Sequence, residues 1–144
     1  MSVEVELQES VGYTPLQRMR HSAAHAMAEA VQELFPDARF AIGPAIEDGF
    51  YYDFELPRPL TPDDLPDIEQ RMARIIAEKQ PFQRDRWQRD KALEYFRAKD
   101  QPYKVEIIEN LPDEEVGIYQ QGHFLDLCRG PHVENTSQIG PFKL

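Results

Sequence analysis

The chain of 144 residues is 41% hydrophobic and 29% charged, which is typical of a globular protein and leaves no apolar run long enough to span a membrane. The formal net charge of -10 argues against a broad nucleic-acid platform, because phosphate binding asks for a basic face. The single cysteine, Cys128, cannot form an internal disulfide, and residues 1–20 contain no apolar signal segment. We therefore expect a reducing, cytoplasmic location and no membrane partner.

The chain begins with an ambiguous segment and then a strong helix signal. Residues 1–14 read as a short strand or a loose tail, and residues 15–144 are predicted to form a single domain. Thr14 can cap a helix and Gln17 completes a capping box, with a proline between them at the first helical position. Apolar residues then recur at helical spacing until Pro36.

The middle of the chain predicts a hairpin, two helices and an extended segment. Residues 39–42 and 50–54 flank Gly-Pro and Glu-Asp-Gly turns, which is typical of a hairpin. A second helix is predicted from Thr61 to about Gln80, followed by an extended stretch at 82–87 and a third helix at 88–99.

The final third is predicted to be rich in strands. Runs at 103–108, 116–120 and 123–127 read as strands, and residues 128–132 follow as a Gly-Pro loop. Strands come in hairpins and helices in separate blocks, so we expect an α+β fold. In that fold an antiparallel sheet packs against the long helix that bears the two histidines His21 and His25.

Two pairs of side chains can carry chemistry. His21 and His25 are four residues apart on a predicted helix, so both project from one face, although such a pair is more often a surface or hydrogen-bonded core pair. Cys128 and His132 lie on the Gly-Pro loop. Three imidazoles and one thiol are the ligand set that tetrahedral zinc prefers, which leaves a zinc site and a metal-free acid–base site open. A Cys–His nucleophile is less favoured, because only the ligand-like spacing supports it.

Other charged residues are ordinary when taken alone. Asp126 stands two residues before Cys128, on the same face of the predicted strand. Lys104 lies on the predicted strand 103–108, where a lone lysine is by default a solvated charge. The stretch 84–91 is locally basic and holds the only tryptophan, which indicates a solvated strand–helix junction more readily than a local nucleic-acid contact.

Four stretches together resemble one family. HSAAH at 21–25, AIGPAIEDGFYYDF at 41–54, PYKVEI at 102–107 and DLCRGPHV at 126–133 are similar to the editing domain of bacterial threonyl-tRNA synthetases, the second of their N-terminal modules. The similarity covers about residues 16–144. The two pairs also resemble those of alanyl-tRNA synthetase editing domains and free-standing alanyl-tRNA deacylases, in which the four residues bind zinc.

The resemblance implies an editing function. Serine lacks one methyl group of threonine, a difference worth only about 1–3 kcal/mol in a binding pocket, so a second site must remove mistakes. The expected reaction is hydrolysis of the ester of mischarged seryl-tRNA(Thr). The expected partners are the 3′ aminoacyl end of tRNA(Thr) and the remaining synthetase domains. The aminoacylation core and anticodon-binding domain are absent from these residues, so we expect no aminoacylation.

The resemblance also implies roles for single residues. His21 and Lys104 are expected to activate water and stabilise charge, with Asp126 as a partner for the substrate ammonium, Tyr52 closing the site and Gly43 admitting the aminoacyl group. The expected substrate-binding residues are His25, Gly43, Tyr52, Asp126, Cys128 and His132. No cofactor is expected.

Two alternatives stay open. The first is a zinc-dependent, free-standing trans-editing deacylase with the metal on His21, His25, Cys128 and His132. The second is a non-catalytic module that binds the tRNA acceptor end.

Overall fold

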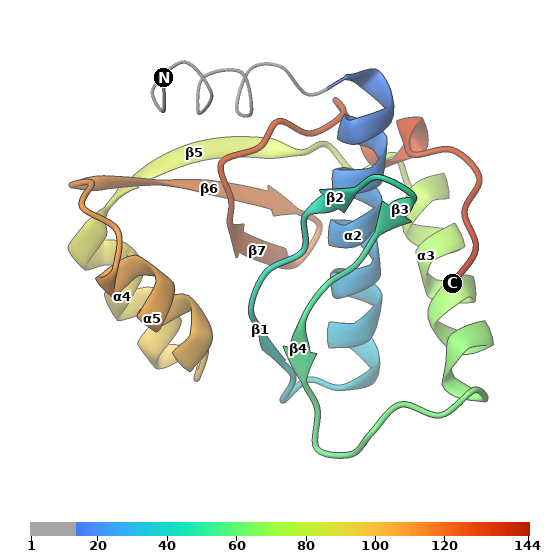
Figure 1. The fold of residues 1–144 in the computed structure, drawn as a ribbon, viewed down its shortest axis with the longest axis horizontal. Helices are drawn as coiled ribbons and strands as arrows, with labels where there is room; N and C mark the ends of the chain where they lie inside the picture. Colours follow the sequence, from blue (N-terminus) through green and yellow to red (C-terminus); the bar gives the residue numbers. More distant parts are fainter. Residues whose placement is uncertain (1–13) are drawn as a thin grey trace.

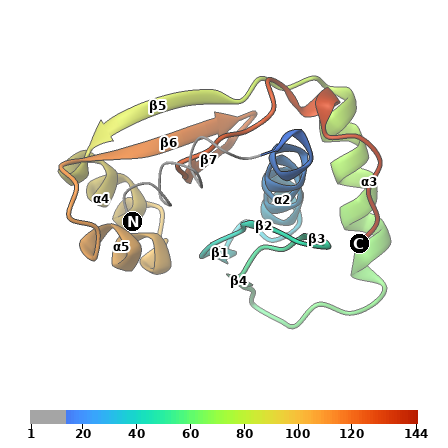
Figure 2. The same cartoon turned by 45° about the horizontal axis from the view of Figure 1, so that its top comes forward.

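The computed structural model describes residues 14–144 and confirms a mixed helix and sheet fold with small antiparallel sheets (Figure 1). The helices are α2 (Pro15–Leu34), α3 (Asp64–Ala77), α4 (Arg89–Ala98) and α5 (Pro102–Glu109), with a short 3-10 turn, η1, at Thr136–Gln138. The main antiparallel sheet has the order β5 (Gln83–Gln88), β6 (Glu115–Gln121) and β7 (Phe124–Leu127). Figure 2 shows α4 and α5 at one end of this sheet and α2 and α3 at the other.

The beginning of α2 is built as its sequence predicts. The Gln17 amide donates to Thr14 Oγ1 at 3.1 Å, and the Thr14 amide donates to Gln17 Oε1 at 2.8 Å. Pro15 occupies the first turn, where its missing N–H leaves no helical hydrogen bond unmade. The run of small residues that follows is buried, which lets other parts of the chain pack closely against this helix.

Two small hairpins lie beside α2. Strand β1 (Arg39–Phe40) pairs with β4 (Phe54–Glu55), and between them β2 (Ala45–Ile46) pairs with β3 (Gly49–Phe50). The predicted hairpin is thus confirmed, with a second, inner hairpin around the turn. Gly43 and Tyr52 fall in the irregular segments that connect the two pairs of strands.

One face of the main sheet is apolar, and the other, called the polar face below, carries Arg84, Arg86 and Asp126 together with the buried Phe124. Its apolar face packs with α4 and α5 through a cluster that includes Val116, Ile118, Leu93 and Phe96. The other face carries the alternate residues of β5 and β6. There Arg84 pairs with Tyr119, and Arg86 pairs with Gly117. Tyr119 in turn pairs with Asp126 on β7, so the polar face leads toward Asp126 and Cys128.

The prediction of a strand at 103–108 is wrong, because these residues form helix α5. The alternation of Val105 and Ile107 is strand-like, but Pro102 stands in the first helical turn, where proline is favoured. Lys104 and Ile108, four residues apart, are the buried residues of this helix. Lys104 is therefore a buried charge and not a solvated one.

The remaining predicted elements agree with the structure. The helices predicted after Thr61 and at 88–99 correspond to α3 and α4, and the extended segment at 82–87 to β5. The prediction of a short strand or loose tail at residues 1–14 lies outside the described residues, except for Thr14. Among residues 14–144, no helix has the length and apolar character that crossing a membrane requires.

Candidate active site

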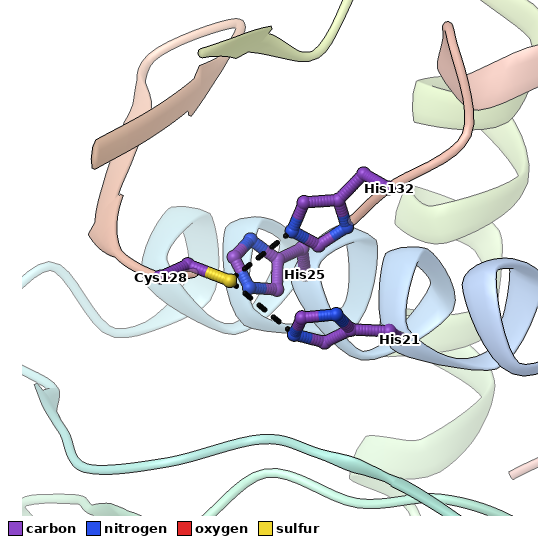
Figure 3. Close-up of side chains that lie close together, drawn as sticks. All are labelled: His21, His25, Cys128 and His132. Carbon is purple, nitrogen blue, oxygen red and sulfur yellow. Dashed lines mark hydrogen bonds between the residues drawn. The ribbon is translucent and has the colours of Figure 1, made fainter. Parts of the chain in front are cut away.

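The two histidine-containing pairs meet at one place. His21 and His25 project from α2, and Cys128 and His132 come from the loop after β7 (Figure 3). Cys128 Sγ lies 3.4 Å from His21 Nε2 and 3.4 Å from His132 Nε2. One nitrogen of each histidine and the sulfur all lie within 4.8 Å of one another.

The proton on His21 is fixed by a carbonyl group. Nδ1 lies 3.3 Å from the Pro131 carbonyl oxygen, which can only accept a hydrogen bond. Nδ1 therefore carries the proton, and in the neutral ring Nε2 has its lone pair directed toward Cys128. Burial lowers the pKa of His21, so the ring is neutral at physiological pH and Nε2 can act as a base or a ligand.

His132 is held by a residue that the sequence reasoning did not identify. Its Nδ1 lies 3.0 Å from Ser22 Oγ, which also accepts a hydrogen bond from the Val133 amide at 3.0 Å. Phe82 stacks on the imidazole at 4.7 Å between ring centroids. Burial, and then the repulsion that His132 would meet from His25 and His21 in their protonated forms, lower the pKa of His132 well below its usual value. The one signal for Ser22 was a hydroxyl in a run of alanines on the buried face of α2.

Cys128 is a neutral thiol. Burial, followed by the Asp126 charge, raises its pKa to about 12. The Gly130 amide donates to Sγ at 3.2 Å, but this does not overcome the burial. Since the thiolate is the nucleophilic form, this environment argues against covalent catalysis by the cysteine.

Lys104, Asp126 and Tyr52 form a buried network beside the cluster. Lys104 Nζ lies 2.7 Å from Asp126 Oδ1 and donates to Tyr52 Oη at 2.9 Å and to the Ala41 carbonyl oxygen. Tyr52 Oη donates to Asp126 Oδ2 at 2.7 Å. The ammonium group thus has two hydrogen-bond acceptors and the Asp126 carboxylate as its ion-pair partner. Burial, and then the Asp126 charge, raise the pKa of Tyr52 well above its usual value, so its hydroxyl stays protonated.

His25 connects the network to the cluster. Its Nε2 lies 3.4 Å from Asp126 Oδ2, while its buried Nδ1 has no hydrogen-bond partner. Burial, and then repulsion from the protonated form of His21 and from the Lys104 ammonium, lower the pKa of His25 well below the usual value. The ring is therefore neutral, with one nitrogen facing a carboxylate and the other unsatisfied.

Gly43 lies against the face of Tyr52. A Cβ atom at this position would stand 2.1 Å from Tyr52 Cδ2, far inside van der Waals contact. Only glycine lets the 41–44 segment approach the tyrosine so closely. Tyr52 is thereby held over Lys104 and Asp126.

A cavity of about 330 Å³ opens onto these groups. Seven of the eight predicted site residues line it: His21, His25, Gly43, Tyr52, Lys104, Asp126 and Cys128. His132 is not among the lining residues, but its Nε2 contacts the sulfur of Cys128, which does line the cavity. The cavity has room for a small aminoacyl group, with neutral imidazoles on one side and the Lys104–Asp126 pair on another.

The four-residue cluster fits a zinc ion. Its donor atoms are three nitrogens and one sulfur within 4.8 Å of one another. His25 supplies a buried nitrogen that lacks a partner, and its other nitrogen faces Asp126, as zinc-bound histidines commonly face a carboxylate. The thiol would have to lose its proton on binding the metal.

The chain is similar to known proteins over most of its length. Residues 116–144 match the family described as threonyl and alanyl tRNA synthetase second additional domain. Threonine–tRNA ligase from Dehalococcoides mccartyi is 52% identical over 139 residues, which cover 96% of this chain and 24% of that protein. The enzymes of the same name from Granulibacter bethesdensis and Sinorhizobium fredii are 54% and 55% identical over 88% and 90% of this chain, and 20% of each relative.

The family match places residues 116–144 in the second additional domain that threonyl- and alanyl-tRNA synthetases share. The chain belongs to the threonyl-tRNA synthetase family, and it spans between a fifth and a quarter of the length of the relatives it matches.

Proposed function

We propose that this chain is the editing domain of a threonyl-tRNA synthetase and hydrolyses the ester of seryl-tRNA(Thr). One observation carries the proposal: His21, whose unprotonated Nε2 can take up a proton, and the Lys104 ammonium line the same small cavity. The chemistry of ester hydrolysis needs a base for the water and positive charge near the oxyanion. Residues 15–144 form the domain in this proposal, which acts in the cytoplasm beside the other synthetase domains.

His21 acts as the base. Its Nε2 accepts a proton from water as the water oxygen adds to the ester carbonyl. The same proton then passes to the departing ribose oxygen, which leaves as the 3′-terminal hydroxyl group. The products are free serine and uncharged tRNA, so His21 returns to its starting state.

Lys104 and Asp126 respond to the substrate together. Because two hydrogen bonds and the ion pair with Asp126 already hold the Lys104 ammonium, the ester oxygen must replace one of these three partners. The ammonium group of the bound serine can replace Lys104 as the ion-pair partner of Asp126, which frees Lys104 to bind the ester oxygen. Lys104 then faces the developing oxyanion, and Tyr52, held by Gly43, closes the pocket over the side chain of serine.

A zinc-dependent deacylase is the second candidate. It is favoured by the unsatisfied His25 Nδ1 and by the close approach of the four donor atoms. When bound, zinc lowers the pKa of a water ligand and polarises a carbonyl group. Without a metal the thiol of Cys128 is protonated, so the metal-free form requires no proton release from this residue. The contact of His21 Nδ1 with the Pro131 carbonyl oxygen fits both forms, because zinc-bound histidines also donate their second nitrogen to carbonyl groups.

Serine release from Ser-tRNA(Thr) tests the proposal, with Thr-tRNA(Thr) as the control substrate. We expect hydrolysis of the seryl ester at least about tenfold faster than of the threonyl ester, the range that one methyl group allows. Loss of hydrolysis in His21→Ala, with tRNA binding retained, is expected. Binding with no hydrolysis by the unmodified protein would instead support the non-catalytic acceptor-end module.

A further inference from the structure

Four of the eleven arginines have no ion pair or side-chain hydrogen bond among the residues that the structure describes. Arg20, Arg39, Arg58, Arg71, Arg74, Arg89 and Arg97 bind carboxylates or carbonyl oxygens. The other four are Arg18, Arg84, Arg86 and Arg129. A chain with a net charge of -10 has many carboxylates to offer, so these guanidinium groups stand out.

Three of these four arginines line one groove. Arg84, Arg86 and Arg129 border a cavity of about 1050 Å³, and all three side chains are exposed. Arg129 also lines the 330 Å³ candidate active-site cavity. Cys128 lies on the walls of both, so the groove leads directly into the candidate active site.

The strand register explains this placement. Arg84 and Arg86 are two residues apart on β5, so both point to the polar face of the sheet. Arg84 lies opposite Tyr119, which pairs with Asp126, and Arg86 lies opposite Gly117, whose carbonyl oxygen accepts from the Cys128 amide at 3.0 Å. Arg84 acts electrostatically on Tyr119, the strand neighbour of Asp126. Burial raises the pKa of Tyr119, and the charge of Arg84 partly opposes that rise.

The end of the groove away from Arg84 is acidic. Asp113, Glu114 and Glu115 line the end at which Glu115 pairs with Gln88, away from Arg84. A polyanion is attracted to the arginines and repelled from this far end. The charges therefore favour a strand that lies beside the arginines and ends at Cys128.

We propose that Arg84, Arg86 and Arg129 bind the phosphodiester groups of a single-stranded RNA 3′ end and deliver its last nucleotide to the His21–Lys104 cavity. This rests on the proposed function for the identity of the strand. Guanidinium groups suit phosphates because their planar donors match two oxygens at once. A groove of exposed guanidinium groups beside a cavity of about 330 Å³ also suits one strand better than a duplex.

The test measures binding of two uncharged RNA minihelices, one with a single-stranded 3′ ACCA end and one without it. Arg84→Gln/Arg86→Gln/Arg129→Gln is expected to weaken binding of the tailed minihelix at least about tenfold. The slope of log K against log salt should fall by about 0.7 for each arginine that contacts a phosphate. The matched control, Lys91→Gln/Arg97→Gln/Lys143→Gln, removes three exposed charges elsewhere and should leave both values unchanged.

Two results would overturn the proposal: equal losses in the two triple variants, or an equal loss for the minihelix without the tail. A second measurement separates this proposal from the proposed function. The ratio of kcat/KM on seryl-minihelix to that on seryl-adenosine should fall about tenfold in Arg84→Gln/Arg86→Gln. If the unmodified protein hydrolyses neither substrate, the editing proposal fails while the binding result still decides the role of the groove.

Discussion

The Lys104 ammonium and the Asp126 carboxylate form an ion pair of 2.7 Å in which the side chains are only 4% and 3% exposed. Removing one partner leaves an uncompensated buried charge. Lys104→Met or Asp126→Leu alone should therefore lower the free energy of unfolding by about 3–5 kcal/mol, whereas the double variant should be close to neutral. Urea unfolding of the four proteins measures this. Arg97→Gln, which breaks an exposed ion pair with Glu109, should cost less than about 1 kcal/mol.

A methyl group at Gly43 should act through Tyr52. Gly43→Ala places a Cβ 2.1 Å from Tyr52 Cδ2, so the tyrosine must move away from Lys104 and Asp126. We expect a loss of about 1–3 kcal/mol in stability and a lower rate of seryl-tRNA hydrolysis. Gly49→Ala is the matched control, because a Cβ there meets nothing within 4 Å. Similar effects of the two substitutions would contradict the role of Gly43.

Glu29 should make stability depend on pH in a defined direction. Burial raises the pKa of its carboxyl group to about 7, although Gln80 donates a hydrogen bond to it. Because the folded-state pKa is above the unfolded value, protonation stabilises the fold below about pH 4.5, and this contribution is lost as pH rises through about 7. Glu29→Gln should therefore be about 1–3 kcal/mol more stable than the unmodified protein at pH 8.

The comparison at low pH provides the control for Glu29. At pH 5 the folded protein holds Glu29 mostly protonated, and the glutamine variant should differ little in stability. Unfolding curves at the two pH values decide the matter. A variant that gains equally at both would show that its effect comes from packing.

The zinc alternative has its own test. Protein purified without chelator should contain well under one equivalent of zinc if the site works without metal. Stoichiometric zinc that disappears in Cys128→Ala would instead establish the four-residue cluster as a metal centre, since the substitution removes one of four ligands. Cys128→Ala should otherwise retain hydrolysis, because its buried thiol is protonated.

Local signals predicted much of the fold from sequence. The capping box at Thr14 and Gln17 and the helical spacing after it fixed α2, and turn residues predicted the paired segments around Gly43. Helix α5 was predicted as a strand, because the alternating branched residues Val105 and Ile107 are typical of strands. The helix-start signal of Pro102 in the first turn was given too little weight. In such short segments, tertiary packing decides between helix and strand.

The candidate site was partly predictable. The two histidine-containing pairs are evident from spacing, but the proximity of His21 to Cys128 depends on the fold of about a hundred intervening residues. Ser22 was not identified as a partner of His132, since nothing local shows which distant ring its hydroxyl will meet. The burial of Lys104 was missed together with its helix.

The central claim is metal-free hydrolysis that depends on His21. The most direct measurement is single-turnover release of serine from Ser-tRNA(Thr) by chelator-treated, zinc-free protein, with His21→Ala in parallel. The expected result is an unchanged rate in the treated protein and a loss of about 100-fold or more in His21→Ala, the usual contribution of a general base. Activity that vanishes with chelator and returns with zinc would contradict the account, as would full activity in His21→Ala.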